Sequence, residues 1–252
     1  MLLRAENLTR RFGGVSALDA VDVELARGAV HAVIGPNGAG KTTLLNVLSG
    51  VYRPHTGRIF IDGTELTSRA AHDFAAAGVS RTFQNLQIFF NMSALENVMV
   101  GRWLRNRASL ACVLLRLPSF ARVEDECRAA AAALMEDLGL GRWLDARADA
   151  MPYGALKRLE IARALAAEPR LLLLDEPAAG LNPSETREID ELIRRIAARG
   201  ITVVLVEHNM KLVMGVAAHV IVLDYGRKLA EGDPRTVSAD ARVIEAYLGG
   251  GA

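Results

Sequence analysis

A glycine-rich segment contains the first residues whose types and spacing suggest chemistry. Residues 35–42 read Gly-Pro-Asn-Gly-Ala-Gly-Lys-Thr, which satisfies the pattern G-x-x-x-x-G-K-[ST]. Glycines let successive backbone N–H groups converge on phosphate oxygens, Lys41 supplies positive charge to the outer phosphates, and the Thr42 hydroxyl is a ligand for Mg²⁺. The segment therefore predicts a nucleotide-binding loop. The alternative is a glycine-rich turn with an incidental lysine.

Two acidic side chains follow an apolar run in the second half of the chain. Four leucines at 171–174 precede Asp175 and Glu176, and parallel α/β sheets place their ligands at the carboxyl ends of strands. We expect Asp175 to hold Mg²⁺ through a water and Glu176 to polarise the attacking water. An ordinary acidic junction between a strand and a loop is the other interpretation.

Three further side chains have two interpretations each. His208 follows an apolar run, and it either donates a hydrogen bond to a γ-phosphate or is a structural or solvated histidine. Gln84 follows a strand-like segment, and it either touches Mg²⁺ and water or caps a strand. Phe12 either stacks on an adenine ring or belongs to a hydrophobic edge. Residue type and position leave these alternatives open.

The elements expected around these residues indicate an α/β fold. Short apolar runs alternate with helical patterns, and two of the runs are continuous, as in strands buried on both faces of a parallel sheet. A helix is expected to begin at Asn182, which provides an N-cap before a proline and a capping glutamate. The expected strands are 29–35, 57–63, 170–176, 201–207 and two strands within 219–232, and a further helix is expected at 42–50.

The middle of the chain has almost no strand pattern. Ser93 opens a helix with a capping-box signature completed by Glu96, and residues 124–138 are alanine-rich and strongly helical. Residues 105–122 alternate basic and apolar side chains and have no assignment. We expect one domain over 1–252, with an α/β core formed by 1–84 and 151–252 and an inserted helical subdomain at 85–150.

Composition and charge exclude several classes of protein. The 252 residues are 51% hydrophobic and 23% charged, which argues against disorder. A formal net charge of +1 removes the main electrostatic reason to expect nucleic-acid binding. Cys112 and Cys127 are too few for a disulfide framework or a zinc cluster and fit a reducing cytosol. No run approaches the roughly 18 apolar residues of a membrane span, so we expect a soluble chain that reaches a membrane through a partner.

Taken together, these motifs resemble one family across essentially the whole chain, the ATP-binding subunits of ABC transporters. Within that family the chain is similar to the subunits of branched-chain amino acid importers. Similar segments are HAVIGPNGAGKTT, RTFQNLQIF, RLEIARAL, DEPAAGLNP, EHNMKLVM, VIEAYLG and the insertion around LLRLPSF. The resemblance implies a P-loop NTPase (ABC ATPase) core with an antiparallel β subdomain and an inserted α-helical subdomain. It also implies ATP and Mg²⁺ as bound groups.

The resemblance assigns roles to individual residues. Gln84 matches the Q-loop glutamine, His208 the switch histidine and Phe12 the aromatic residue that stacks on adenine. The implied nucleotide-binding residues are Phe12, Asn37, Gly38, Ala39, Gly40, Lys41, Thr42 and Thr43. The implied catalytic residues are Glu176, His208, Lys41 and Gln84, and the implied Mg²⁺ ligands are Thr42, Gln84 and Asp175.

One motif departs from the family pattern. The signature, ideally Leu-Ser-Gly-Gly-Gln, falls on Met-Pro-Tyr-Gly-Ala at 151–155, and only Gly154 is kept outright. Pro152 removes a hydroxyl and a backbone donor, and Ala155 removes a side-chain amide. In this family the signature of one subunit closes over the phosphate loop of its partner, so the change affects the partner's site. Tyr153 before a glycine does occur in the branched-chain group, which leaves open a divergent but working motif.

The resemblance also implies a transport complex. Two ATP-binding subunits enclose two ATP molecules, and these importers commonly use two different subunits, so we expect a heterodimer; a homodimer is open to the isolated chain. Two membrane permease subunits and a periplasmic substrate-binding protein complete the system. The chain is then a peripheral protein on the cytoplasmic side of the inner membrane.

Several competing functions follow from the same motifs. Import of another amino acid, an amide or urea is open, because the transported molecule never touches this subunit. An exporter ATPase, such as one for lipopolysaccharide, is opposed by the branched-chain-like segments. A soluble ABC ATPase acting on ribosomes or DNA is opposed by the near-neutral charge and the short helical segment. A regulatory module without turnover is opposed by Lys41, Asp175, Glu176 and His208.

Overall fold

The chain divides into two compact units. The computed structural model describes residues 1–105 and 118–248, without the side chains of 118–120 and Leu248. Met1–Arg81 and Arg170–Ala252 form the core unit, and Thr82–Pro169 forms the helical unit. The described part leaves out Cys112, most of the unassigned 105–122 segment and the last four residues. The expectation for Cys112 therefore lies outside it.

The boundaries of the helical unit differ from those expected. Residues 151–169 were expected in the α/β core, whereas the structure groups them with the helical unit. The physical reason is packing, because helix α6 (Tyr153–Leu165) lies against α3 (Ala94–Gly101) of that unit. The helical unit also begins slightly earlier than residue 85, at Thr82.

Two sheets form the core unit, as an α/β fold with an antiparallel subdomain requires. The larger sheet has the order β10-β9-β3-β8-β7-β6, parallel from β9 to β6 with β10 antiparallel to β9. The smaller sheet is antiparallel, in the order β2-β1-β4-β5. The strands are β1 (Leu3–Phe12), β2 (Val15–Leu25), β3 (Val30–Ile34), β4 (Thr56–Ile61), β5 (Thr64–Glu65), β6 (Val79–Arg81), β7 (Leu171–Asp175), β8 (Thr202–Val206), β9 (His219–Asp224) and β10 (Arg227–Gly232).

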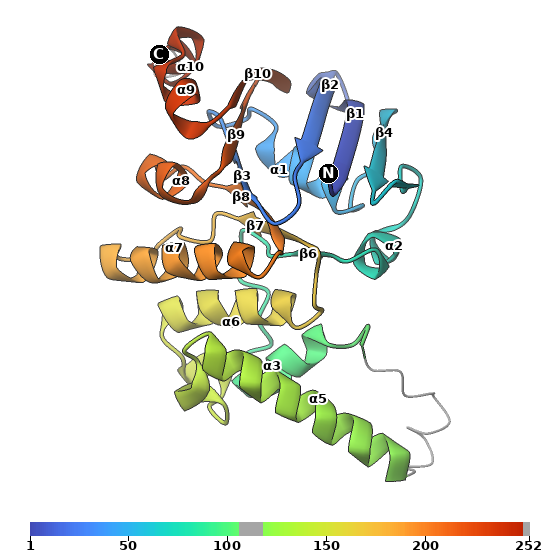
Figure 1. The fold of residues 1–252 in the computed structure, drawn as a ribbon, viewed down its shortest axis with the longest axis vertical. Coiled ribbons are helices and arrows are strands. Elements are labelled where there is room, and N and C mark those ends of the chain that lie inside the picture. The colour runs from blue at the N-terminus through green and yellow to red at the C-terminus, as the bar shows by residue number, and fades with distance from the viewer. Residues whose placement is uncertain (106–117, 249–252) are drawn as a thin grey trace. The chain divides into compact units, whose positions relative to one another are not determined.

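Strand β3 is buried on both faces, which explains its uninterrupted apolar sequence. Val33 joins a core shared by the two sheets and helix α1, whereas Ala32 and Ile34 join a second core with α8, α9 and α10. Alternate residues of a strand point to opposite faces, so the sheet is covered on both sides (Figure 1). The helices of the core unit are α1 (Lys41–Leu48), α2 (Ala71–Ala76), α7 (Pro183–Ala198), α8 (Met210–Val216), α9 (Pro234–Ala239) and α10 (Ala241–Leu248).

Helix α7 begins where its sequence predicts. The Asn182 side chain accepts hydrogen bonds from the N–H groups of Ser184 and Glu185, and Glu185 accepts one from the Asn182 N–H at 3.0 Å. The start of the helix therefore satisfies its own backbone donors. Its buried face consists of Ile189, Leu192, Ile193 and Ile196, and it packs against β8 and β3.

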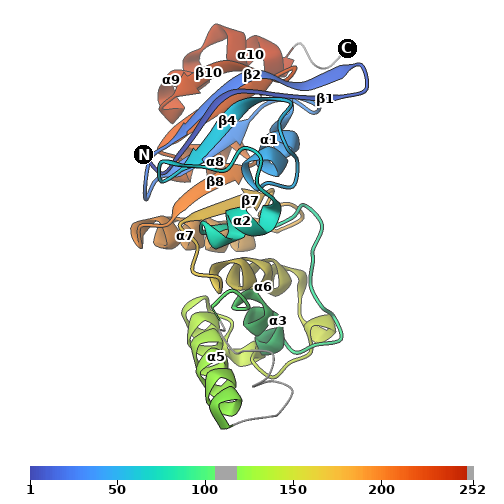
Figure 2. The ribbon, with the colours of Figure 1, turned by 90° about the vertical axis from the view of Figure 1, so that its right-hand side faces the viewer.

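The helical unit is built around α3. This helix packs against both α5 (Pro118–Asp137) and α6, and Figure 2 shows the three helices together. Ser93 and Glu96 form the expected capping box at its start. Two 3₁₀ turns, Gly141–Trp143 and Ala148–Ala150, connect α5 to α6. In the described part of the chain, every helix is too short or too polar to span a bilayer.

Candidate active site

The glycine-rich segment connects β3 to α1 in the core unit. Gly40 is the N-cap of α1 with φ at 102°, and a Cβ there would collide with the Ala17 carbonyl. A Cβ at Gly35 would likewise collide with the Leu223 carbonyl. Helix α1 has no side-chain cap, so its first N–H groups suit an anion such as a phosphate. Asn37 and Gly38 are exposed at the tip of the loop.

Lys41 lies inside this loop. Its Nζ donates to the carbonyl oxygens of Gly35 at 2.7 Å and Pro36 at 2.9 Å. Burial lowers the pKa of Lys41, and the nearby carboxylates of Glu176 and Asp175 oppose that change. Thr42, the next residue, is exposed, Thr43 is half-buried, and Ala39 is buried. The loop therefore combines a cation, a hydroxyl and backbone donors, as a phosphate site requires.

Asp175 forms a buried ion pair at the end of β7. Its Oδ2 lies 3.1 Å from Nη2 of Arg81, and both side chains are almost fully buried. Burial raises the pKa of Asp175, and the Arg81 guanidinium opposes the rise. The same guanidinium donates to Oδ1 of Asn46 at 2.6 Å and to Oγ of Ser49 at 3.2 Å. Arg81, which the sequence analysis did not single out, thus links β6, β7 and α1.

Glu176 and His208 face each other across neighbouring strand ends. Glu176 Oε1 and His208 Nε2 lie 2.7 Å apart. Glu176 has φ at 49°, and its N–H donates to the Val206 carbonyl at 2.9 Å. A left-handed conformation costs a residue with a Cβ about 1–2 kcal/mol, and such strain gathers at functional sites. The structure therefore brings together two of the residues expected to act in catalysis.

Glu207 is a third acidic residue at this edge, and the sequence analysis assigned it no role. It is only 4% exposed, and its carboxylate accepts hydrogen bonds from the N–H groups of Ala178, His208 and Asn209. Burial raises the pKa of Glu207, and these three backbone hydrogen bonds oppose the rise. Its position directly after an apolar strand, as for Asp175, was the available signal.

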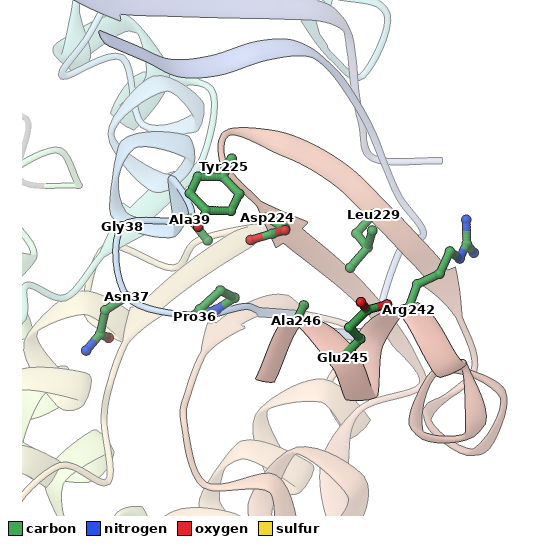
Figure 3. Close-up of a pocket in the computed structure, with 10 residues that line it drawn as sticks. All are labelled: Pro36, Asn37, Gly38, Ala39, Asp224, Tyr225, Leu229, Arg242, Glu245 and Ala246. Atoms are coloured by element: carbon green, nitrogen blue, oxygen red, sulfur yellow. The ribbon is translucent and has the colours of Figure 1, made fainter. Parts of the chain in front are cut away.

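The C-terminal helix adjoins the phosphate loop. Figure 3 shows a pocket of about 580 Å³ between the loop, the turn after β9 and α10. Residues of α10 that line it include Arg242 and Glu245, and Tyr225 of the turn is exposed. Burial raises the pKa of Tyr247 on α10, and the nearby backbone of Gly35 opposes the rise. Helix α10 therefore lies beside the first glycine of the loop.

Phe12 lies at the end of β1. Its ring packs edge-on against Tyr52 with centroids 5.3 Å apart, and the Arg10 guanidinium carbon lies 4.8 Å from its centroid. The side chain is still 41% exposed. These contacts fit a hydrophobic edge and leave part of the ring accessible, so adenine stacking stays a prediction.

Gln84 and the signature residues belong to the helical unit, and their roles at a nucleotide site stay predictions. Gln84 is exposed in a loop whose flanks are held by Glu160 of α6, which hydrogen-bonds to the backbones of Phe83 and Gln87. Burial raises the pKa of Glu160. Pro152 is the N-cap of α6, Tyr153 is exposed, and Gly154 and Ala155 are buried.

The fold is that of an ATP-binding cassette. Residues 18–179 match the model of the ABC transporter family, and residues 227–252 match the branched-chain amino acid ATP-binding cassette transporter model. The chain belongs to the ABC transporter family, and the expected fold, family and ATPase class are confirmed.

Curated relatives match along nearly their full length. The chain is 42% identical over 249 residues to the high-affinity branched-chain amino acid transport ATP-binding protein BraF of Pseudomonas aeruginosa. It is also 42% identical over 249 residues to LivG of Escherichia coli K12, a protein with the same description. In both comparisons 98% of each chain is covered.

Solved structures match equally far along the chain. A nucleotide-free ATP-binding cassette from an ABC transporter superposes with a TM-score of 0.86 at 32% identity. The ADP conformation of an ATP-binding cassette superposes with a TM-score of 0.84 at 32% identity. Each match covers 98% of both chains.

Proposed function

We propose that this chain hydrolyses ATP to energise an importer of branched-chain amino acids. The observation that supports hydrolysis most directly is the 2.7 Å approach of Glu176 and His208, on the sheet edge that also holds Lys41. The substrate class follows from the printed functions of BraF and LivG and from the branched-chain model at residues 227–252.

The residues at this edge fit a nucleotide phosphate with Mg²⁺. The uncapped start of α1 and the Lys41 ammonium suit phosphate oxygens. Thr42 and Asp175 offer the hard oxygen ligands that Mg²⁺ prefers. Among the described residues, no group of three or more His, Cys, Asp or Glu side chains could hold a metal unaided, so Mg²⁺ would share ligands with the nucleotide.

The proposed roles follow from these positions. Bound Mg²⁺ would neutralise charge that develops on the phosphates. Lys41 and the backbone N–H groups orient the terminal phosphates. Glu176 accepts a hydrogen bond from the attacking water, and the His208 N–H, which faces Glu176 in this structure, turns to donate to the γ-phosphate when nucleotide binds. Gln84 links the core unit to the helical unit in sequence, and we assign it contact with water or Mg²⁺ when nucleotide binds.

Exchange of Glu176 for Gln tests the hydrolytic role. Glu176→Gln keeps the side-chain shape but removes the charge that polarises water, so we expect turnover to fall by about 10³-fold. Magnesium-dependent binding of ATP, measured by calorimetry, should persist. Glu191→Gln, an exposed exchange on α7, is the matched control. Undiminished ATP hydrolysis in Glu176→Gln would contradict the proposed role.

The proposed complex contains further subunits. We infer a second ATP-binding subunit, two membrane permeases and a periplasmic binding protein, with this chain peripheral on the cytoplasmic face. The departures at Pro152 and Ala155 support a heterodimer, because they weaken the site that this chain completes in its partner. Identification of the permeases and ATPases that co-purify from membranes tests this composition. Transport in liposomes by this chain and the permeases, with no second ATPase, would exclude the heterodimer.

A further inference from the structure

Glu207 is a buried carboxylate that the nucleotide-binding motifs do not include. It follows β8 directly and is 4% exposed. Its Oε1 accepts a hydrogen bond from the Ala178 N–H at 2.9 Å. Its Oε2 accepts from the His208 N–H at 3.1 Å and from the Asn209 N–H at 3.4 Å. One side chain therefore contacts the backbone of two separate loops.

These two loops carry the pair expected to act in hydrolysis. Ala178 lies two residues after Glu176, in the loop that follows β7. The contacts on Oε2 belong to the loop after β8, which carries His208 and continues into α8 through the N-cap Asn209. The two oxygens of Glu207 thus contact both loops, and the side chains of Glu176 and His208, which these loops carry, lie 2.7 Å apart.

Stability alone does not account for a carboxylate at this position. Burial raises the pKa of Glu207, and the negative charge of Glu176 raises it further. Burying a charge carries a desolvation cost that a neutral side chain would avoid. What the carboxylate provides is two acceptor oxygens at a fixed separation, which a single backbone carbonyl or hydroxyl lacks.

We propose that Glu207 is a positioning residue for ATP hydrolysis, whose two oxygens set the loops after β7 and β8 so that Glu176 and His208 meet. The inference rests on the proposed roles of those two residues. Glu207 acts through them and has no contact with nucleotide in this mechanism. Its removal therefore affects the reaction step and leaves nucleotide affinity in place.

The first test separates turnover from binding. Glu207→Gln keeps the volume but has one acceptor oxygen, and its amide N–H₂ group would face a backbone N–H. Because a displacement of about 1 Å at a reacting group costs on the order of 10²-fold in rate, we expect kcat to fall by about that factor. The dissociation constant for Mg-ATP and the KM should each change by less than about threefold, which is well below the tenfold change that corresponds to about 1.4 kcal/mol of binding free energy.

Thr202→Val provides the matched control on the same strand. Thr202 is fully buried at the opposite end of β8, and its Oγ1 accepts a hydrogen bond from the Gly28 N–H at 2.9 Å. Both variants remove a buried acceptor and should lower Tm. Only Glu207→Gln should lower kcat. An equal loss of kcat in Thr202→Val at the same loss of Tm would overturn the proposal.

A double-mutant cycle with His208→Ala measures the coupling of the two residues in kcat. A purely structural role of Glu207 would give no such coupling. If Glu207 acts through His208, Glu207→Gln should lower kcat by a smaller factor in the His208→Ala background than in the unaltered chain. The same cycle is run with Glu176→Gln, and an undiminished factor in both the His208→Ala and the Glu176→Gln backgrounds would overturn the proposal. Glu207→Asp, which keeps the charge but is one methylene shorter, replaces Glu207→Gln in these assays if that variant fails to fold.

Different results would contradict the proposed function and the role of Glu207. Full turnover in Glu176→Gln would remove the proposed function and this inference with it. Loss of turnover in Glu176→Gln together with an unchanged kcat in Glu207→Gln would remove the inference alone.

Discussion

The helices of this protein begin in two different ways, and α3 of the helical unit contrasts with α1 of the core unit. Ser93 and Glu96 satisfy the N–H groups at the start of α3 and its flanking residue. Helix α1 starts at a left-handed glycine, Gly40, without any side-chain cap. Backbone N–H groups at a helix start need partners; α3 supplies them from its own sequence, whereas no capping side chain serves those of α1.

Helix α6 resembles α1 in how it starts but differs from it in the contacts of its lysine. Its N-cap, Pro152, offers no side-chain acceptor, so its first N–H groups resemble those of α1. The contacts of their lysines differ: the Lys41 ammonium is held by the carbonyls of its own loop, whereas the Lys157 ammonium lies 5.8 Å from the ring centroid of Tyr153. An uncapped start is therefore common to α1 and α6, and the lysine inside the loop distinguishes the start of α1, where we propose that phosphate binds.

Among the tests of this comparison between helix starts, the largest effect is expected at Lys41. Lys41→Met removes the ammonium and should weaken Mg-ATP binding by about 10- to 100-fold, the range of a charge-assisted hydrogen bond. Lys157→Met is the control, because Lys157 is also a buried lysine but lies on α6. We expect its nucleotide affinity to stay unchanged. Calorimetry on both variants measures the difference, and equal affinities would break the distinction between α1 and α6.

An intermediate effect is expected when a cap is added to α6. The backbone of Pro152 is extended, with φ −66° and ψ 154°, which suits an N-cap serine. Pro152→Ser supplies an acceptor for the N–H groups of the first turn and should raise the free energy of unfolding by about 1 kcal/mol. Urea denaturation measures this change. A loss of stability would show that the proline's restriction of the unfolded chain outweighs the missing cap.

The smallest effect is expected at the self-capped helix. Hydrogen bonds from Ser93 lower the pKa of Glu96, so its charged form stabilises the folded state above the unfolded pKa. Glu96→Gln should cost a few tenths of a kcal/mol at pH 7, as for other exposed charged contacts. The difference should vanish as the pH falls through the lowered pKa of Glu96. Thermal unfolding of both proteins from pH 7 to pH 3 measures it; a constant difference would contradict the capping role.

Local patterns predicted several elements of both units, because apolar runs and helix caps are short-range features, but they did not predict strands β1 and β2. The apolar runs at 170–176 and 201–207 became β7 and β8, and the caps at Ser93 and Asn182 started α3 and α7. The assignment of 151–169 to the core was different. Its helical character was clear, but a helix sequence does not state which neighbours it packs against.

The candidate site was predictable where it consists of contiguous motifs. Lys41, Asp175, Glu176 and His208 lie on one edge because the topology of parallel strands brings their ends together. The partners of these residues were not predictable. Arg81 meets Asp175 across 94 residues of chain, and Tyr247 meets Gly35 from the far end of the sequence. Such pairs depend on three-dimensional packing, and no local pattern encodes them.

The position of Arg81 along the chain gives its contacts a further consequence. Arg81 is the last residue of β6 and the last residue of the core unit before the chain enters the helical unit. Its guanidinium pairs with Asp175, the carboxylate that we propose holds Mg²⁺. It also donates a hydrogen bond to Asn46 of helix α1. A change of backbone conformation at Arg81, where the chain leaves the core unit, would therefore displace a hydrogen-bond partner of both Asp175 and Asn46.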